Sequence, residues 1–156
     1  MAGVFLAGTG LGLAYNAVSG NGISLRTPER APYAEQVRWR LHREGQLVTL
    51  AEVRAVLEDG RTVLVDARAS SAYASGHIPG ALNIPVSEFH PDMADRLAHL
   101  PRSTPVITYC TGEACQSSVG LADWLREDLG FENVRVFYGG WAAWIGADGP
   151  LDTGDE

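Results

Sequence analysis

Short apolar runs alternate with amphipathic stretches through most of the chain. The apolar runs, rich in β-branched residues, predict buried strands at residues 62–65, 81–84, 105–109 and 134–137. Stretches with a helical pattern predict helices at residues 50–59, 69–75, 87–100 and 117–129. Because strand and helix alternate, we expect an α/β fold in which helices cover a central parallel sheet.

Some of these helices carry further signals. Thr49 and Glu52 have the spacing of a capping box, and Gly60 follows the last residue of the first helix. The predicted helix at 87–100 directs three apolar side chains inward, those of Met93, Leu97 and Leu100.

The first eighteen residues are mostly apolar, and residues 1–25 contain no charged side chain. Such a stretch is about the minimum that spans a hydrocarbon core of about 30 Å, so we expect a transmembrane helix at residues 1–20. Gly8 and Gly12 have the spacing that lets two membrane helices approach closely, so self-association or a helical membrane partner is expected there. A signal peptide and a segment packed within the soluble domain remain alternative interpretations.

The stretch that follows the apolar run is basic. Tyr33, Val37 and Leu41 recur every four residues and predict a short amphipathic helix within a connector that carries five arginines against three acids. Positive charge after the apolar run places the following domain in the cytoplasm, anchored to a bacterial inner membrane, with a soluble cytoplasmic protein as the alternative. The predicted segments are an anchor at 1–20, a connector at 21–46, the main domain at 47–152 and a tail at 153–156.

Composition excludes several function classes. The net charge of −7 and the lack of a Lys/Arg-rich patch interleaved with aromatic residues argue against a nucleic-acid partner. The two cysteines, five residues apart, make neither a disulfide scaffold nor a zinc site, and we expect no metal or cofactor.

Cys110 has the position of a reactive thiol. It follows the predicted strand at 105–109 and precedes a helix that begins near Ser117 or Ser118. Amide N–H groups at a helix start have no partner within the helix and favour an anion, so they lower the pKa of a thiol placed there. A buried structural cysteine at a strand end is the alternative interpretation.

Several separated motifs in the same order closely resemble the rhodanese (sulfurtransferase) family. They lie between residues 49 and 150, at Asp66-Ala67-Arg68, 73–85, Tyr109-Cys110, 130–134 and 139–144. The resemblance implies a three-layer fold with a central parallel sheet flanked by helices. It also implies that Cys110 is the catalytic residue and carries a persulfide.

The resemblance assigns roles around Cys110. The active-site loop that binds substrate comprises Thr111, Gly112, Glu113, Ala114, Cys115, Gln116 and Ser117. Asp66 and Arg68 are expected to brace the neighbouring loops, and His77 to fix a turn, although His77 as a general base is an alternative. Trp141 and Trp144 are expected in the core, while the glycines at 139–140 could let the main chain approach the site.

The loop departs from the family pattern. Active rhodaneses usually carry an arginine or lysine there, whereas the one charged residue of this loop is Glu113. A dianion such as thiosulfate would depend on main-chain amides alone, so a neutral or thiol-bound donor suits the loop better. Gln116 in place of an arginine excludes a rhodanese-related phosphatase.

We therefore expect a sulfurtransferase of the thiosulfate sulfurtransferase type. Its persulfide on Cys110 would take sulfane sulfur from thiosulfate or a small persulfide and pass it to a thiol or another nucleophile. One alternative is a thiol-disulfide or persulfide-reducing module, because the Cα atoms of Cys110 and Cys115 could lie within the roughly 4.4–6.8 Å that a disulfide needs. In the competing interpretation Cys115 is a packing residue. The other alternative function is a membrane-tethered binding domain without catalysis.

Overall fold

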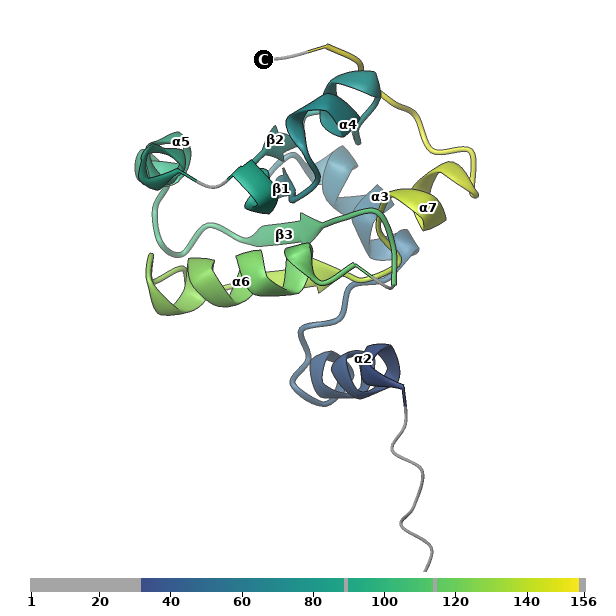
Figure 1. Ribbon diagram of the computed structural model, residues 1–156, viewed down its shortest axis with the longest axis horizontal. Coiled ribbons are helices and arrows are strands. Elements are labelled where there is room, and N and C mark those ends of the chain that lie inside the picture. Colours follow the sequence, from purple (N-terminus) through teal and green to yellow (C-terminus); the bar gives the residue numbers. More distant parts are fainter. Residues whose placement is uncertain (1–31, 89, 114, 155–156) are drawn as a thin grey trace, which may run out of the picture. The chain divides into compact units, whose positions relative to one another are not determined.

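The computed structural model describes residues 32–88, 90–113 and 115–154 (Figure 1). The anchor predicted at 1–20, with Gly8 and Gly12, lies outside the described residues, as do the first part of the connector and Ala114. Within the described ranges, every helix is too short or too polar to cross a bilayer.

A parallel four-stranded sheet forms the centre of the fold and confirms the α/β prediction. The strands lie in the order β2 (Leu82–Asn83), β1 (Val63–Asp66), β3 (Val106–Tyr109) and β4 (Val134–Phe137). In the register of the sheet, Asp66 pairs with Tyr109 and Tyr109 pairs with Phe137. Three strands therefore end together at one edge, which is where open α/β sheets bind ligands.

Helices cover both faces of the sheet. They are α2 (Tyr33–Arg43), α3 (Leu50–Asp59), α4 (Ser70–Ser75), α5 (Asp95–Ala98), α6 (Ser117–Glu127) and α7 (Gly140–Ile145), with 3-10 turns η1 (Val86–Glu88) and η2 (Pro91–Ala94). Successive strand residues point to opposite faces, so Val106 packs in one core cluster and Ile107 in the other. The first cluster includes residues of α2, α5 and α6, and the second includes residues of α3, α4 and α7. The fold thus has three layers.

Helix α3 begins and ends as its sequence predicts. The Thr49 hydroxyl accepts the Glu52 N–H at 3.3 Å, and Glu52 Oε2 accepts the Thr49 N–H at 2.8 Å, which is a capping box. Gly60 ends the helix with φ 65°. The pKa of the Glu52 carboxyl group is lowered, mainly because its carboxylate accepts a hydrogen bond from the Thr49 main-chain N–H.

The single helix predicted at 87–100 is wrong. This stretch instead forms η1, η2 and the four-residue helix α5. Pro91 disfavours helical geometry at the residue before it and has no N–H to donate, which explains a break at this point. Leu97 is fully buried as predicted, whereas Met93 and Leu100 are partly buried.

Helix α2 is the amphipathic helix predicted within the connector. Val37 and Leu41 are buried in the core cluster that contains Cys110, and the Tyr138 hydroxyl donates to the Ala34 carbonyl at 3.0 Å. Tyr33, the first residue of the apolar repeat, is 60% exposed, so the buried face of α2 is formed by Val37 and Leu41. Helix α2 is therefore packed on the domain.

Candidate active site

Cys110 lies at the carboxyl edge of the sheet, directly after β3. Cys110 is buried, with 4% of its surface exposed. A loop leads from it to Ser117, the first residue of α6 (Figure 1). The Cys110 carbonyl accepts the Trp141 N–H at 2.7 Å, and the Thr111 carbonyl accepts the Ala142 N–H at 2.9 Å. The first amides of α7 therefore fix the start of the active-site loop.

Gly140 makes this contact between α7 and the loop possible. Its φ is +56°, and a Cβ at this position would collide with the Cys110 carbonyl. A residue with a side chain would thus face both backbone strain and a clash. The two adjacent glycines after β4 signalled a close main-chain approach, and the structure assigns that approach to Gly140.

Among the predicted loop residues that the structure describes, Thr111 and Cys115 contact the Cys110 side chain. Cys110 and Cys115 form a disulfide, and their Cα atoms are 6.2 Å apart. This separation lies within the range of about 4.4–6.8 Å for disulfides, so the geometric expectation for the pair is confirmed. The Cys115 N–H donates to the Gly112 carbonyl at 2.9 Å, which turns the chain back toward Cys110.

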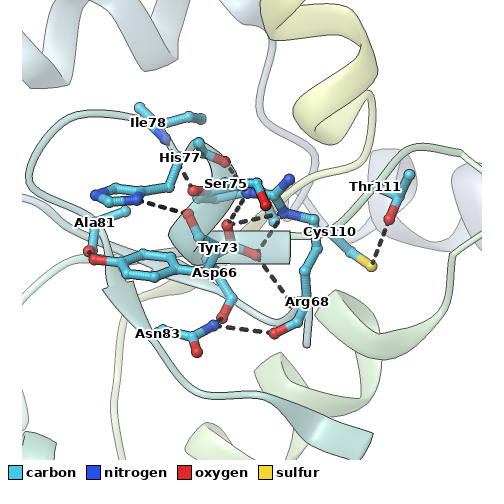
Figure 2. Close-up of polar contacts among 12 residues, drawn as sticks. Asp66, Arg68, Tyr73, Ser75, His77, Ile78, Ala81, Asn83, Cys110 and Thr111 are labelled. Carbon is cyan, nitrogen blue, oxygen red and sulfur yellow. Dashed lines mark hydrogen bonds and ion pairs between the residues drawn. The ribbon is translucent and has the colours of Figure 1, made fainter. Parts of the chain in front are cut away.

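Other loop residues line the path from Cys110 to α6. The Thr111 hydroxyl lies 3.9 Å from Cys110 Sγ (Figure 2), a distance at which it can donate to sulfur. Gln116 precedes α6, and Ser117 is its first residue. The Ser118 carbonyl accepts the Thr108 hydroxyl at 2.7 Å, so a buried hydrogen bond joins the first turn of α6 to β3.

A cation from outside the loop faces its one acid. Arg38 of α2 places Nη1 3.9 Å from Glu113 Oε1, and both side chains are well exposed. The negative charge of Glu113 also contributes, after burial, to raising the pKa of Tyr138. Helix α2 therefore borders the active-site loop, which the sequence did not indicate.

Asp66 and Arg68 form a buried ion pair beside the site (Figure 2). Arg68 Nη2 donates to Asp66 Oδ2 at 2.6 Å and to the Gly76 carbonyl at 2.7 Å, and the Arg68 N–H donates to Asp66 Oδ1. The guanidinium also lies over the Trp141 ring, 4.5 Å from its centroid. The pair therefore connects the ends of β1, α4 and α7.

Two polar residues that the sequence did not single out complete this arrangement. Asn83 Nδ2 donates to the carbonyls of Asp66 and Arg68, each at 3.0 Å. The Tyr109 hydroxyl accepts the Ile78 N–H at 3.1 Å. Burial, followed by the charge of Asp66, raises the pKa of Tyr109, so its hydroxyl stays protonated.

His77 is buried in the turn after α4 (Figure 2). Its ring stacks on Tyr73 with centroids 3.7 Å apart, and Nδ1 lies 3.0 Å from the Tyr73 carbonyl, which makes Nδ1 the protonated nitrogen. The His77 main chain exchanges two hydrogen bonds with Asp152. These contacts suit a residue that fixes a turn.

The two tryptophans divide between core and site. Trp144 is fully buried, whereas Trp141 is partly buried beneath Arg68. Across the three described ranges, the histidines, cysteines and acids do not gather into a group of three that could hold a metal ion.

Comparison with known proteins identifies relatives of this chain. A sequence model of the rhodanese-like domain family matches residues 49–147. An HTH-type transcriptional regulator of Mycobacterium tuberculosis is 38% identical over 107 residues, which cover 69% of this chain and 45% of that protein. A tRNA uridine(34) hydroxylase of Staphylococcus aureus is 36% identical over 106 residues, covering 66% of this chain and 32% of that protein. The chain thus spans less than half of each relative.

Among solved structures, a thiosulfate sulfurtransferase of Pseudomonas aeruginosa matches with a TM-score of 0.61 and 27% identity. The match covers 79% of this chain and 22% of that one.

Proposed function

Because the chain belongs to the rhodanese-like domain family, we propose that it is a sulfurtransferase that carries sulfane sulfur as a persulfide on Cys110. The observation that carries the proposal is the position of Cys110 between β3 and α6, with its main chain fixed by α7. The structural similarity to a thiosulfate sulfurtransferase supports the same reaction class.

The reaction has two displacement steps. The Cys110 thiolate attacks the sulfane sulfur of a donor, whose S–S bond breaks, and the donor remnant leaves with the electron pair. A thiolate acceptor then attacks the terminal sulfur of the Cys110 persulfide, and Cys110 departs as the thiolate. Charge accumulates on sulfur in both steps, so fixed N–H donors at the site lower their barriers.

Helix α6 supplies such donors. The first N–H groups of a helix have no partner within it, and among the described residues Gln116 makes no side-chain cap to satisfy them. The Thr111 hydroxyl near Cys110 Sγ is a further donor to a thiolate. These groups support an anionic sulfur at Cys110 without a cationic side chain.

The charges near the loop favour a small persulfide over thiosulfate as the donor. The loop contains no arginine or lysine, Arg38 faces Glu113, and Arg68 is paired with Asp66. A thiosulfate dianion would find little uncompensated positive charge there. A thiol-bound sulfane sulfur carries less negative charge and therefore requires less positive charge at the site. The proposed acceptor is a thiol.

We also propose that residues 1–20 attach the domain to a membrane, with the domain in the cytoplasm. The support is the uncharged sequence of residues 1–25 and the arginines that follow it. Residues Gly8 and Gly12 would mediate contact with a second membrane helix.

Sulfur loading of Cys110 is tested by intact-mass spectrometry of the reduced protein after one equivalent of glutathione persulfide. The Cys115→Ser variant, in which the loop disulfide cannot form, is expected to gain about 32 Da, the mass of one sulfur atom. The variant with both Cys110→Ser and Cys115→Ser is expected to gain none. Equal loading of the two variants would exclude Cys110 as the carrier, and loading of neither would leave a binding domain as the better assignment.

A further inference from the structure

We infer that Cys115 resolves the persulfide of Cys110, so that the protein releases hydrosulfide and closes the Cys110–Cys115 disulfide. The inference rests on the proposed function, since it begins with the persulfide that this function forms. It adds a second activity, persulfide reduction, to sulfur transfer.

The structure contains the product of this reaction. Cys110 and Cys115 are bonded, with Cα atoms 6.2 Å apart. In the same state, the carbonyls of Cys110 and Thr111 keep their hydrogen bonds to the amides of Trp141 and Ala142. Cys115 therefore reaches the catalytic sulfur without displacing the contacts that hold the start of the loop.

The loop is folded so that Cys115 approaches Cys110. The Cys115 N–H donates to the Gly112 carbonyl, and Gln116 and Ser117 then lead into α6. Cys115 is half-buried and packs against the core cluster that includes Cys110. Its accessibility distinguishes it from a sealed packing residue and gives an external thiol a way to reach the disulfide.

The electrostatics give the persulfide no cationic partner in the loop. Arg38 lies near Glu113, and Arg68 is buried against Asp66. A persulfide anion in this loop is thus stabilised by neutral hydrogen-bond donors. The adjacent Cys115 thiol competes with external acceptor thiols for reaction with this persulfide. Because the thiol belongs to the same loop, its effective concentration is high.

The Cys115 thiol gives its proton to the terminal sulfur of the Cys110 persulfide. The resulting Cys115 thiolate attacks Sγ of Cys110, and the bond between Sγ and the terminal sulfur breaks. The terminal sulfur leaves as hydrosulfide with its proton and the electron pair. The two cysteines are oxidised to the disulfide, and the sulfane sulfur is reduced to sulfide.

An external dithiol is required to close the cycle. One of its thiolates attacks the disulfide to form a mixed disulfide, and its second thiol displaces the protein, leaving both cysteines reduced and the dithiol oxidised. Cys115 is more accessible than Cys110, so it is the sulfur that the dithiol attacks first. Cys110 then leaves as the thiolate that starts the next turnover.

The test compares reduced full-length wild type with Cys115→Ser and Cys115→Ala after one equivalent of glutathione persulfide. Wild type is expected to release about one equivalent of hydrosulfide without added reductant and to yield a Cys110–Cys115 cross-linked peptide. Both variants are expected to retain the added sulfur on Cys110 and to release hydrosulfide only when excess thiol is added, because one thiol takes the sulfur as a persulfide and a second reduces that persulfide. The two substitutions guard against a folding defect in either one, and thermal unfolding checks that both are folded.

Each contrary result is distinct. If wild type keeps a persulfide on Cys110 while Cys115 remains open to alkylation, Cys115 does not resolve it and sulfur transfer still stands. If the variants instead accumulate a glutathione mixed disulfide, hydrosulfide comes from attack on the inner sulfur of the donor, and the inference is wrong. If neither variant gains any adduct, the proposed function fails together with the inference.

Discussion

The position of Cys110 is fixed by its main chain. Its carbonyl accepts the Trp141 amide, and the adjacent Gly140 lies so close that a Cβ cannot be accommodated. The side chain of Cys110 is thereby held toward the loop, where its sulfur is bonded to Cys115. The residues that determine this placement come from α7, thirty positions later in the chain.

We predict that Gly140→Ala slows sulfur loading of Cys110 at least tenfold. The new methyl group collides with the Cys110 carbonyl and must displace the loop from its position. A displacement of about 1 Å can cost about 100-fold in rate. The measurement is the rate of mass gain with glutathione persulfide in the Cys115→Ser background.

Gly60→Ala is the matched control for Gly140→Ala. Gly60 has a similar φ of +65°, yet a Cβ there would meet no atom within 4 Å. Gly60→Ala introduces the same backbone strain as Gly140→Ala but no contact with the active-site loop. The free energy of unfolding should therefore fall by about 1–2 kcal/mol, while the rate of sulfur loading of Cys110 stays normal. Equal loading rates in both variants would mean that the α7 contact does not position Cys110.

Removal of the Asp66 carboxylate is expected to destabilise the fold strongly. The Arg68 and Asp66 side chains are 6% and 0% exposed, so Asp66→Asn leaves a buried guanidinium without its counter-charge. We expect a loss of about 3–5 kcal/mol in the free energy of unfolding. Urea unfolding at neutral pH measures it.

The exposed ion pair of Asp59 and Arg61 provides the comparison for Asp66. Its nitrogen and oxygen are 3.1 Å apart, but the side chains are 47% and 83% exposed. Asp59→Asn should cost less than about 1 kcal/mol, because water and salt screen such a pair. Similar losses for the two variants would show that burial of the Asp66 pair does not determine its strength.

At the scale of elements, short helices position the site by their ends. The first amides of α7 bind loop carbonyls, and the start of α6 is tied to β3 through Thr108 and Ser118. Helix α3 illustrates how such an end is stabilised, since its capping box satisfies the main-chain N–H of Glu52 and that of Thr49. The Glu52 side chain additionally accepts from Arg135 at 3.0 Å, which joins α3 to β4.

The capping box predicts a pH-dependent contribution to stability. The pKa of Glu52 in the folded protein is below its usual value of 4.5, so its carboxylate stabilises the fold above that pH. The contribution is lost as the pH falls through the lower, folded-state pKa. We expect Glu52→Gln to reduce the free energy of unfolding by about 0.3–1 kcal/mol at pH 7, and by progressively less below the usual pKa.

Denaturant unfolding of wild type and Glu52→Gln from pH 7 down to acidic pH measures this difference. Glu58→Gln, at an exposed position near the other end of α3, should change stability by less than about 0.5 kcal/mol at pH 7. A difference for Glu52→Gln that stays constant into acid would contradict the role of its carboxylate.

At the scale of the whole molecule, α2 is the part of the basic connector that packs on the rhodanese-like domain. Leu41 is fully buried in the domain core, Tyr138 binds the Ala34 carbonyl, and Arg38 faces the active-site loop. A truncation at residue 49, where the family match begins, would therefore expose core residues. A chain beginning at residue 32 retains these contacts.

A chain that begins at residue 32 allows membrane attachment to be tested while the contacts of α2 are kept. We predict that the full chain sediments with membranes and resists extraction by high salt and alkaline pH, because residues 1–20 are apolar and uncharged. The chain beginning at residue 32 is expected to stay in the supernatant. Recovery of the full chain as a monodisperse species without detergent would exclude the anchor.

The sequence alone determined the features that depend on local pattern. Continuous apolar runs located β1, β3 and β4, and helical patterns located α3 and α6, because side-chain burial follows backbone geometry. Thr49 and Gly60 marked the ends of α3, since caps satisfy main-chain groups only a few residues away. The position of Cys110 between a strand and a helix followed from the same patterns.

The tertiary structure decided the features that depend on residues distant in sequence. The glycines at 139–140 signalled a close main-chain approach, but only the folded chain identified the Cys110 carbonyl as the partner of Gly140. Local pattern carries no signal for Arg38 beside Glu113, or for the hydrogen bond from Asn83 to the Asp66 carbonyl. The spacing of Cys110 and Cys115 permitted a disulfide, but the bond required the folded loop, because two side chains meet only where the whole main chain brings them.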